Sequence, residues 1–147
     1  MKKQFYLTQS GVDELKGEHQ LLVAQRAPIA ERLQAARAQG DLAENAEYIA
    51  TREEQERTEG RIAEIEHILM NVDIIKKPRG DAKVQLGSTV TLKNSETKVF
   101  QVVGTVEADP VNGKISDESP LGKAVMGKSV GDKVIIKNIT HKILKIS

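Results

Sequence analysis

The chain has 147 residues and a mass of 16.2 kDa, which excludes a large multi-lobed enzyme and allows one compact domain or two small ones. Its 22 Lys and Arg nearly balance 21 Asp and Glu, so overall charge favours neither nucleic acid nor membrane binding, and 3% aromatic residues are too few for base-stacking surfaces. Cysteine is absent and no apolar run approaches a membrane span of about 18 residues, so we expect a cytoplasmic protein without disulfides or membrane contact.

Charge and composition divide the chain in two. Up to Pro78 there are 11 basic and 14 acidic residues in a background of Ala, Gln and Leu, whereas from Arg79 onward there are 11 basic and 7 acidic residues among Val, Ile and Thr. Pro cannot continue a helix, so Lys76–Gly80 is a natural linker. We therefore predict a coiled-coil finger over residues 1–77 and a globular domain over residues 78–147.

The first part carries two helical seams with steps of three and four residues. The first seam contains Val12, Leu15, His19, Leu22, Arg26, Ile29, Leu33 and Ala36. The second contains Tyr48, Thr51, Gln55, Thr58, Ile62, Ile65, Leu69 and Val72. Such seams are typical of coiled coils, and they face each other if the chain folds back around residue 42. The sequence predicts an all-α antiparallel hairpin, roughly 40 Å long at the rise of an α-helix.

The sequence also predicts where the first helix starts and where it bends. Thr8 and Ser10 are candidate N-caps, because a side-chain oxygen there can accept from the free N–H groups of the first turn. Pro28 lies inside the helix and removes one backbone hydrogen bond. Since the seam keeps its phase on both sides of Pro28, we predict a kink and not a break.

The second part has the pattern of a small α+β domain with an antiparallel sheet. Four runs rich in Val, Ile and Thr predict strands at 84–92, 98–106, 133–139 and 142–146. Asn112-Gly113 predicts a turn before a short strand at 114–116. Ser119 followed by Pro120 predicts the start of a short helix that ends at Gly127.

The centre of the hairpin carries the most informative chemistry. Asp41 and Glu44 lie three residues apart, so both carboxylates emerge on one face if the second helix begins near Asp41. The alternative is a capping box, with Asp41 as N-cap and Glu44 at the third helical position. Two carboxylates alone leave most of the six-coordinate shell of Mg²⁺ open, so a metal at this tip needs a partner that supplies the other ligands. Two-metal phosphodiester hydrolysis is a reaction that uses such a shared ion.

Basic and aromatic side chains flank these carboxylates. Arg37 and Arg52 can neutralise a phosphate backbone, or they can form ordinary ion pairs with glutamates on the helices. Tyr48 can contact a nucleotide, or it can pack in the seam. The residues alone leave both alternatives open.

Two blocks of sequence resemble the Gre transcript-cleavage factors of bacterial RNA polymerase. The first is Gly40-Asp41-Leu42-Ala43-Glu44-Asn45-Ala46-Glu47-Tyr48, followed by Arg52-Glu53. The second runs from Ile115-Ser116 through Ser119-Pro120-Leu121-Gly122-Lys123-Ala124 to Gly131-Asp132. The scattered arginines of the arm are more similar to the GreA type of this family than to the GreB type. Gly17 and Gly122-Lys123 depart from the family pattern, and neither departure touches the tip.

The resemblance implies a C-terminal FKBP-like domain and a function as an accessory factor that is not itself an enzyme. It implies docking on the bacterial RNA polymerase elongation complex through Ser119, Pro120, Leu121 and Lys123. The finger then enters the secondary channel, where Asp41 and Glu44 help to hold a polymerase Mg²⁺ and the attacking water. Arg37, Arg52 and Tyr48 match positions that contact the 3′ end of the nascent RNA, which the polymerase cleaves in backtracked complexes. The family functions in transcription regulation and DNA binding, and we expect a monomer without a cofactor of its own.

Two other functions are compatible with the same features. A channel-blocking regulator would fill the same pore and inhibit the polymerase without promoting hydrolysis. A coiled-coil adaptor or holdase would use the seam to bind partner helices and would be insensitive to the charge of the tip.

Overall fold

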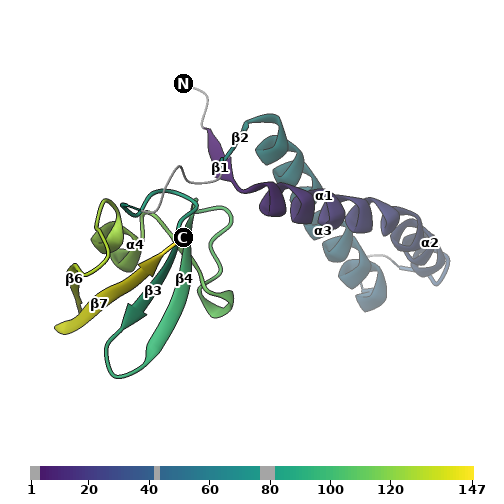
Figure 1. Ribbon diagram of the computed structural model, residues 1–147. Helices are drawn as coiled ribbons and strands as arrows, with labels where there is room; N and C mark the ends of the chain where they lie inside the picture. Colours follow the sequence, from purple (N-terminus) through teal and green to yellow (C-terminus); the bar gives the residue numbers. More distant parts are fainter. Residues whose placement is uncertain (1–3, 42–43, 77–81) are drawn as a thin grey trace. The chain divides into compact units, whose positions relative to one another are not determined.

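The computed structural model describes residues 4–41, 44–76 and 82–147. The chain divides into two compact units, Asp13–Asn71 and the combination of Met1–Val12 with Val72–Ser147. We call them the hairpin unit and the globular unit (Figure 1). The predicted domain boundary after Lys77 lies outside the described residues and stays a prediction. Across the described ranges, no helix has the length and apolar character needed to cross a membrane.

Three helices build the hairpin unit: α1 (Gln9–Ala24), α2 (Arg26–Arg37) and α3 (Ala46–Met70). Ion pairs between the two arms join Glu18 to Arg61, Arg26 to Glu59 and Arg32 to Glu54. The residue numbers of the paired side chains rise along the first arm as they fall along the second, so α1 and α2 run antiparallel to α3. This pairing is close to the predicted alignment. The predicted helical hairpin is therefore confirmed, and Figure 1 shows the arms side by side.

A narrow seam of buried side chains holds the arms together. Its buried members are Leu15, Ile29, Leu33, Ala36, Thr51, Thr58, Ile62, Ile65 and Ile68. All of them except Ile68 lie at predicted seam positions. Arg26 was placed in the seam incorrectly: its side chain is about half exposed and pairs with Glu59. A guanidinium is always charged and strongly disfavours an apolar interior, so it leaves the seam for a surface carboxylate.

The first arm is interrupted where Pro28 predicted a kink. A single residue, Gln25, separates α1 from α2, and its φ of −77° and ψ of −14° remain helical. Pro28 has no N–H to donate to the carbonyl of Ala24, and the N–H of Gln25 bonds to the Leu22 carbonyl at 3.1 Å in a tighter turn. The helical hydrogen-bond pattern thus breaks for one residue while the backbone keeps helical dihedral angles.

The globular unit contains two sheets. β1 (Phe5–Leu7) and β2 (Val72–Ile74) form a parallel pair that we did not predict. The second sheet has the order β5-β4-β3-β7-β6. Its strands are β3 (Thr89–Lys93), β4 (Thr97–Val103), β5 (Lys114–Ser116), β6 (Lys133–Ile136) and β7 (Ile139–Ile146).

This larger sheet is mixed, so the prediction of a purely antiparallel sheet was wrong. β5 pairs parallel to β4. Residues 104–113, which include the 3₁₀-helix η1 (Pro110–Asn112), lead the chain back along the sheet, so β5 begins in the same direction as β4. The predicted turn at Asn112-Gly113 is confirmed, with Gly113 at a φ of +77°. The two C-terminal strands meet at Lys137-Asn138 and not further along, and the φ values of 51° and 65° there fit a type I′ hairpin.

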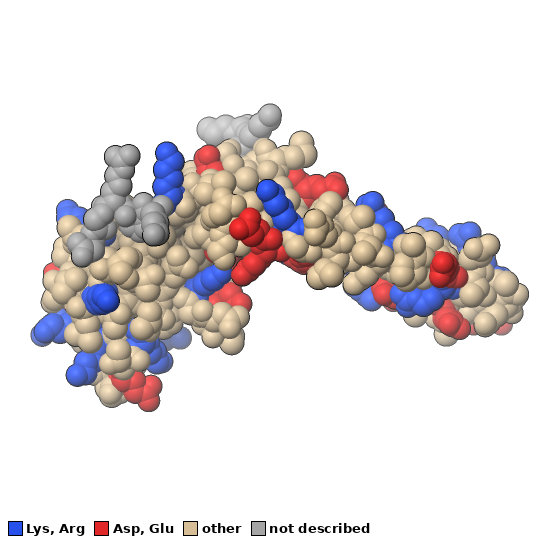
Figure 2. Space-filling view, turned by 45° about the vertical axis from the view of Figure 1, so that its right-hand side comes forward, with Lys and Arg blue, Asp and Glu red and all other residues tan. Residues whose placement is uncertain are grey.

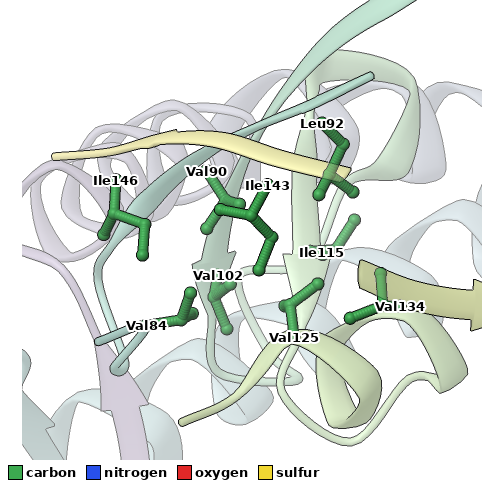
Figure 3. Close-up of a cluster of buried hydrophobic side chains, with 9 residues drawn as sticks. All are labelled: Val84, Val90, Leu92, Val102, Ile115, Val125, Val134, Ile143 and Ile146. Carbon is green, nitrogen blue, oxygen red and sulfur yellow. The ribbon is translucent and has the colours of Figure 1, made fainter. Parts of the chain in front are cut away.

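The core of the globular unit lies on one face of this sheet, beneath α4 (Pro120–Val125) and the segment around Val84 (Figure 3). Val90 pairs with Ile146 and Leu92 with Ile143, so β7 has one extra residue between the two pairings. This bulge lets two isoleucines that are three positions apart both point into the core. The cluster contains Val84, Val90, Leu92, Val102, Ile115, Val125, Val134, Ile143 and Ile146.

A buried carboxylate ties the first turn of α1 into the globular unit. The Glu107 side chain is only 4% exposed, and its carboxylate accepts from the Thr8 N–H at 2.7 Å and the Thr8 hydroxyl at 2.6 Å. The Thr8 oxygen in turn accepts from the Gly11 N–H at 3.1 Å, which confirms Thr8 and not Ser10 as the cap. A Cβ at Gly11 would overlap the Glu107 carboxylate, so a larger residue there would force this side chain to shift.

Candidate functional site

The two predicted carboxylates lie where the chain passes from α2 to α3. Asp41 and Glu44 are both exposed, and both precede the first residue of α3, Ala46. The second helix begins at Ala46 and not near Asp41, so the helical spacing considered for this pair does not apply. They lie instead on the connection at the tip, before regular structure resumes.

Asn45 caps α3, which excludes the capping-box alternative. Its φ of −88° and ψ of 96° are non-helical, and its Oδ1 accepts from the Tyr48 N–H at 3.0 Å. Its Nδ2 donates to the Ala36 carbonyl at 2.7 Å, so one amide satisfies both the start of α3 and the end of α2. Neither Asp41 nor Glu44 is needed as the cap. Asn45 was not predicted as the cap, although Asn is one of the most favoured N-caps.

The end of α2 turns sharply before the carboxylates. The Ala38 N–H bonds to the Gln34 carbonyl at 3.2 Å, and the Gln39 N–H bonds to the Ala36 carbonyl at 3.2 Å. Gly40 then adopts a φ of +126°, a conformation that strains any residue with a Cβ. The glycine therefore sets the chain direction just before Asp41.

The structure brings together the three residues predicted to contact RNA. The Arg37 Cζ lies 5.8 Å from the centroid of the Tyr48 ring, and Arg52 donates to the Tyr48 hydroxyl at 3.4 Å. Arg37, followed by Arg52, lowers the pKa of Tyr48 below its ordinary value, because both cations stabilise the phenolate. Arg52 also lies 3.6 Å from Glu56, as the surface-pair alternative predicted. Tyr48 is half-buried, so it packs partly in the seam while its hydroxyl faces the arginines.

Three other arginines of the hairpin form two-pronged ion pairs with carboxylates on the opposite arm. The nitrogen-to-oxygen distances are 2.8 and 2.9 Å for Arg26–Glu59, 2.9 and 2.9 Å for Arg32–Glu54, and 2.8 and 2.9 Å for Arg61–Glu18. Hydrogen bonds from these guanidiniums lower the pKa of each glutamate. Figure 2 shows both charges interspersed along the hairpin. These arginines serve the contact between the arms, whereas Arg37 and Arg52 meet at Tyr48.

Within the ranges that the structure describes, no group of three or more His, Cys, Asp or Glu side chains could hold a metal ion. The tip offers two carboxylates, and Mg²⁺ takes six oxygen ligands. Any tight Mg²⁺ site at this tip would therefore need ligands from a second molecule.

The predicted docking residues lie on the first turn of α4. Ser119 is its N-cap, with Oγ accepting from the Gly122 N–H at 3.0 Å and donating to the Ser116 carbonyl at 2.6 Å. Pro120 is exposed at the start of the helix, as is Lys123 one turn later. A Cβ at Gly122 would overlap the Ser116 carbonyl, so the departure from the family pattern at this position suits the local backbone.

Leu121, the fourth residue predicted to dock, lines a cavity of about 370 Å³ in the globular unit. Its apolar lining residues are Leu92, Phe100, Leu121 and Ile136. Its polar lining residues are Asn94, Ser95, Glu96, Lys98 and His141. An apolar lining with a few polar groups is a common form of recognition site.

Comparison with known proteins covers nearly the whole chain. Residues 5–74 match the family described as "Transcription elongation factor, N-terminal", and residues 79–147 match "Transcription elongation factor, GreA/GreB, C-term". The chain is 52% identical to the transcription elongation factor GreA of Acholeplasma laidlawii, covering 96% of this chain and 92% of that protein. It is 43% identical to GreA of Macrococcus caseolyticus, covering 100% and 99%. A solved structure of the transcription factor Gfh1 is 28% identical over 99% of each chain, with a TM-score of 0.50.

Proposed function

The chain belongs to the GreA/GreB transcription elongation factor family, whose members stimulate transcript cleavage by RNA polymerase, and we propose that its hairpin tip supplies two carboxylates to the polymerase active site. The factor binds a backtracked elongation complex of bacterial RNA polymerase and inserts the tip through the secondary channel. The polymerase then cleaves the 3′ end of the nascent RNA and resumes synthesis. The factor is an accessory to another enzyme's nuclease activity.

The exposure of Asp41 and Glu44 at the tip is the observation that carries this proposal. Asn45 takes over the capping of α3, so the two carboxylates are not needed to begin the helix. Carboxylate oxygens are preferred ligands of Mg²⁺, and the polymerase would supply the remaining ligands. In two-metal hydrolysis one ion activates the attacking water and the other stabilises the leaving oxygen. The factor needs no cofactor of its own, since the Mg²⁺ is shared with the polymerase.

The cluster of Arg37, Tyr48 and Arg52 would hold the RNA 3′ end beside these carboxylates. Guanidinium groups bind phosphate oxygens with charge-assisted hydrogen bonds. Because Arg52 donates to the Tyr48 hydroxyl, the phenol proton can be donated to an RNA oxygen. The three side chains thus offer donors to an extruded RNA end, next to the carboxylates that recruit the metal.

Ser119, Pro120, Leu121 and Lys123 would form the docking contact with the polymerase. Leu121 opens onto the cavity of the globular unit, and Lys123 adds a nearby positive charge. If α4 docks and the tip promotes hydrolysis, a Lys123→Glu variant loses polymerase binding, whereas tip variants keep it. Equal binding by Lys123→Glu and the natural chain would contradict this docking contact.

The decisive experiment is RNA cleavage in purified, backtracked polymerase complexes. The double variant Asp41→Asn/Glu44→Gln keeps the size and hydrogen-bonding capacity of the tip but removes its charge. We expect it to bind polymerase and to stimulate cleavage at least on the order of a hundredfold less, because the extra metal ion contributes several kcal/mol to the reaction. A matched control, Glu31→Gln/Glu53→Gln, removes two exposed carboxylates elsewhere on the hairpin. It should stimulate cleavage by the polymerase as well as the natural chain does. Cleavage by the tip variant at the natural rate would refute the proposal.

The same proposal makes the protein a monomer in the cytoplasm, where the polymerase is found. Light scattering of the purified chain tests the first statement. DNA binding stays a prediction, because none of the descriptions of the related proteins mentions it.

A further inference from the structure

The helix that leads into the hairpin unit lacks part of its own N-terminal cap. In a capping box, the N-cap side chain accepts from the N–H of the third helical residue, and a Glu or Gln at that third position accepts from the N–H of the N-cap. Thr8 is the N-cap of α1, and its side-chain oxygen accepts from the Gly11 N–H at 3.1 Å. Gly11 holds the third helical position and has no side chain, so the local sequence supplies only half of the box.

Glu107, which lies 99 residues after Thr8, supplies the other half. Its carboxylate accepts from the Thr8 N–H at 2.7 Å, which is the bond that a Glu at the third helical position would make. It also accepts from the Thr8 hydroxyl at 2.6 Å. A Cβ built on Gly11 would lie 2.6 Å from the Glu107 Cδ, so the distant carboxylate fills the space of the missing side chain. The capping box of α1 is therefore completed from the connection between β4 and β5.

Glu107 is itself held firmly in the globular unit. Its side chain is only 4% exposed, and the Lys114 Nζ on β5 lies 3.4 Å from its carboxylate. Its N–H bonds to the Gly104 carbonyl at 3.1 Å. β1 passes so close to this segment that a Cβ on Gly104 would overlap the Tyr6 carbonyl. The carboxylate that caps α1 thus has a fixed place beside β1 and β5.

Apolar contacts support the same turn of α1. Leu7 precedes the N-cap, and Val12 is the fourth helical residue, which is the spacing of a hydrophobic staple. Both side chains are buried, with 1% and 4% of their surface exposed. A staple fixes the angle at which the chain enters a helix, so packing and directional hydrogen bonds act together at this point.

We propose that Glu107 is a positioning residue for transcript cleavage, because it holds the first turn of the arm that delivers the tip carboxylates. This role rests on the proposed function. The arm continues from this turn through α1 to Ala24 and through α2 to Arg37, next to the tip. Along roughly 40 Å of helix, a rotation of about 1.5° at the base moves the far end by about 1 Å. A misplacement of that size can slow a reaction about a hundredfold.

A purely stabilising role for Glu107 is the alternative. A Glu in place of Gly11 would cap the helix within a single turn, without the burial of a carboxylate between distant segments. Buried ion pairs can often be replaced by packed apolar side chains at no loss of stability, so stability alone does not account for this arrangement. A distant carboxylate adds what a local one lacks, namely a fixed connection between the start of α1 and the globular unit.

The test moves the capping carboxylate from the globular unit to the helix. The variant Gly11→Glu/Glu107→Ala places a Glu at the third helical position and empties the space that it needs, so the cap is kept while the connection is lost. Cleavage is measured in backtracked polymerase complexes at a saturating concentration of the factor, and polymerase binding is measured separately. We expect the maximal rate to fall about tenfold to a hundredfold, with unchanged binding and a melting temperature close to that of the natural chain.

Two single variants complete this experiment. Glu107→Ala should stimulate cleavage as poorly as the double variant and should also melt at a lower temperature, because it loses the cap and the connection together. Thr8→Ser keeps the hydroxyl and is the matched control, which should stimulate cleavage as the natural chain does. A natural cleavage rate in the double variant would overturn the proposal, since the carboxylate would then serve only the start of the helix.

A second measurement does not depend on cleavage. The chain has no cysteine, so spin labels can be attached through Arg57→Cys on the hairpin unit and Lys128→Cys on the globular unit, both at exposed positions. The distribution of distances between the labels should be broader with Glu107→Ala, and with Gly11→Glu/Glu107→Ala, than with the natural residues. An unchanged distribution would also overturn the proposal. Because the factor is measured alone, this result stands apart from whether the tip carboxylates promote cleavage.

Discussion

The hairpin unit and the globular unit are stabilised in different ways. The globular unit buries nine aliphatic side chains in one continuous cluster. The buried seam of the hairpin unit includes two threonines among its aliphatic residues, and three two-pronged ion pairs join the arms. Hydrophobic burial dominates the stability of the globular unit. A larger share of the stability of the hairpin unit depends on ion pairs and on helix caps.

This difference suits the proposed division of labour. A thin helical arm carries exposed polar groups at its end without surrounding them, whereas a packed sheet offers a firm surface for docking. A thin arm also has little apolar surface to lose, so its stability should respond to conditions that leave the globular core unaffected. Substitutions and pH changes that act on one unit more than on the other test this contrast.

Truncation of a core side chain should have the largest effect. Ile143 in the globular unit and Ile65 in the hairpin are both fully buried. Ile143→Ala should lower the free energy of unfolding of the globular unit by about 2–5 kcal/mol, and Ile65→Ala should cost less because two helices can close on the space that is left. Denaturant unfolding followed by NMR signals from each unit measures both values. An equal or larger cost at Ile65 would argue against a weaker hydrophobic contribution in the hairpin.

Removal of the tip cap comes second. Asn45→Ala deletes the acceptor for the Tyr48 N–H and the donor to the Ala36 carbonyl, so we expect the hairpin to lose about 1–2 kcal/mol of unfolding free energy. Asn45→Asp is the matched control, because it keeps the acceptor and removes only the donor. Hydrogen exchange of the amides at the start of α3 reports the local effect. If both variants exchange like the natural chain, Asn45 does not hold the tip.

Acidification should have the smallest effect on the hairpin, where it acts through the ion pairs between the arms. Hydrogen bonds from arginines on the opposite arm lower the pKa values of Glu18, Glu54 and Glu59 below the ordinary 4.5. A lowered pKa means that the ionised form is favoured in the folded state, so this stabilisation is present above pH 4.5 and is lost as the pH falls through the lowered values. The melting temperature of the hairpin should therefore fall modestly as the pH is lowered below 4.5, and also at high salt, since the pairs are largely exposed.

A triple variant sharpens this pH experiment. Glu18→Gln/Glu54→Gln/Glu59→Gln should melt at a lower temperature at neutral pH and should lose part of the acid sensitivity. Glu31→Gln/Glu53→Gln, already used as a control for cleavage, should retain it. If the triple variant is as sensitive to acid as the natural chain, the cross-arm pairs do not contribute.

Local patterns in the sequence determined the architecture of both units. The steps of three and four residues predicted two helices with matching seams, and eight of the nine buried hairpin residues lie where those steps placed them. Ser119-Pro120 predicted the start of α4 because a cap and a proline act within one turn of the chain. The two signature blocks led, through family resemblance, to the prediction of the tip carboxylates and of the docking segment, and those roles stay predictions.

Contacts between distant residues were decided only by the tertiary structure. The parallel pairings of β1 with β2 and of β4 with β5 depend on how connections route the chain, and strand composition does not record this. Asn45 became the cap because the Ala36 carbonyl, nine residues earlier, lies within reach of its amide. Strand register likewise places Lys142 opposite both Lys93 and Lys133, although these residues are far apart in the sequence. A short-range pattern specifies an element, whereas the neighbours of that element follow from the packing of the whole chain.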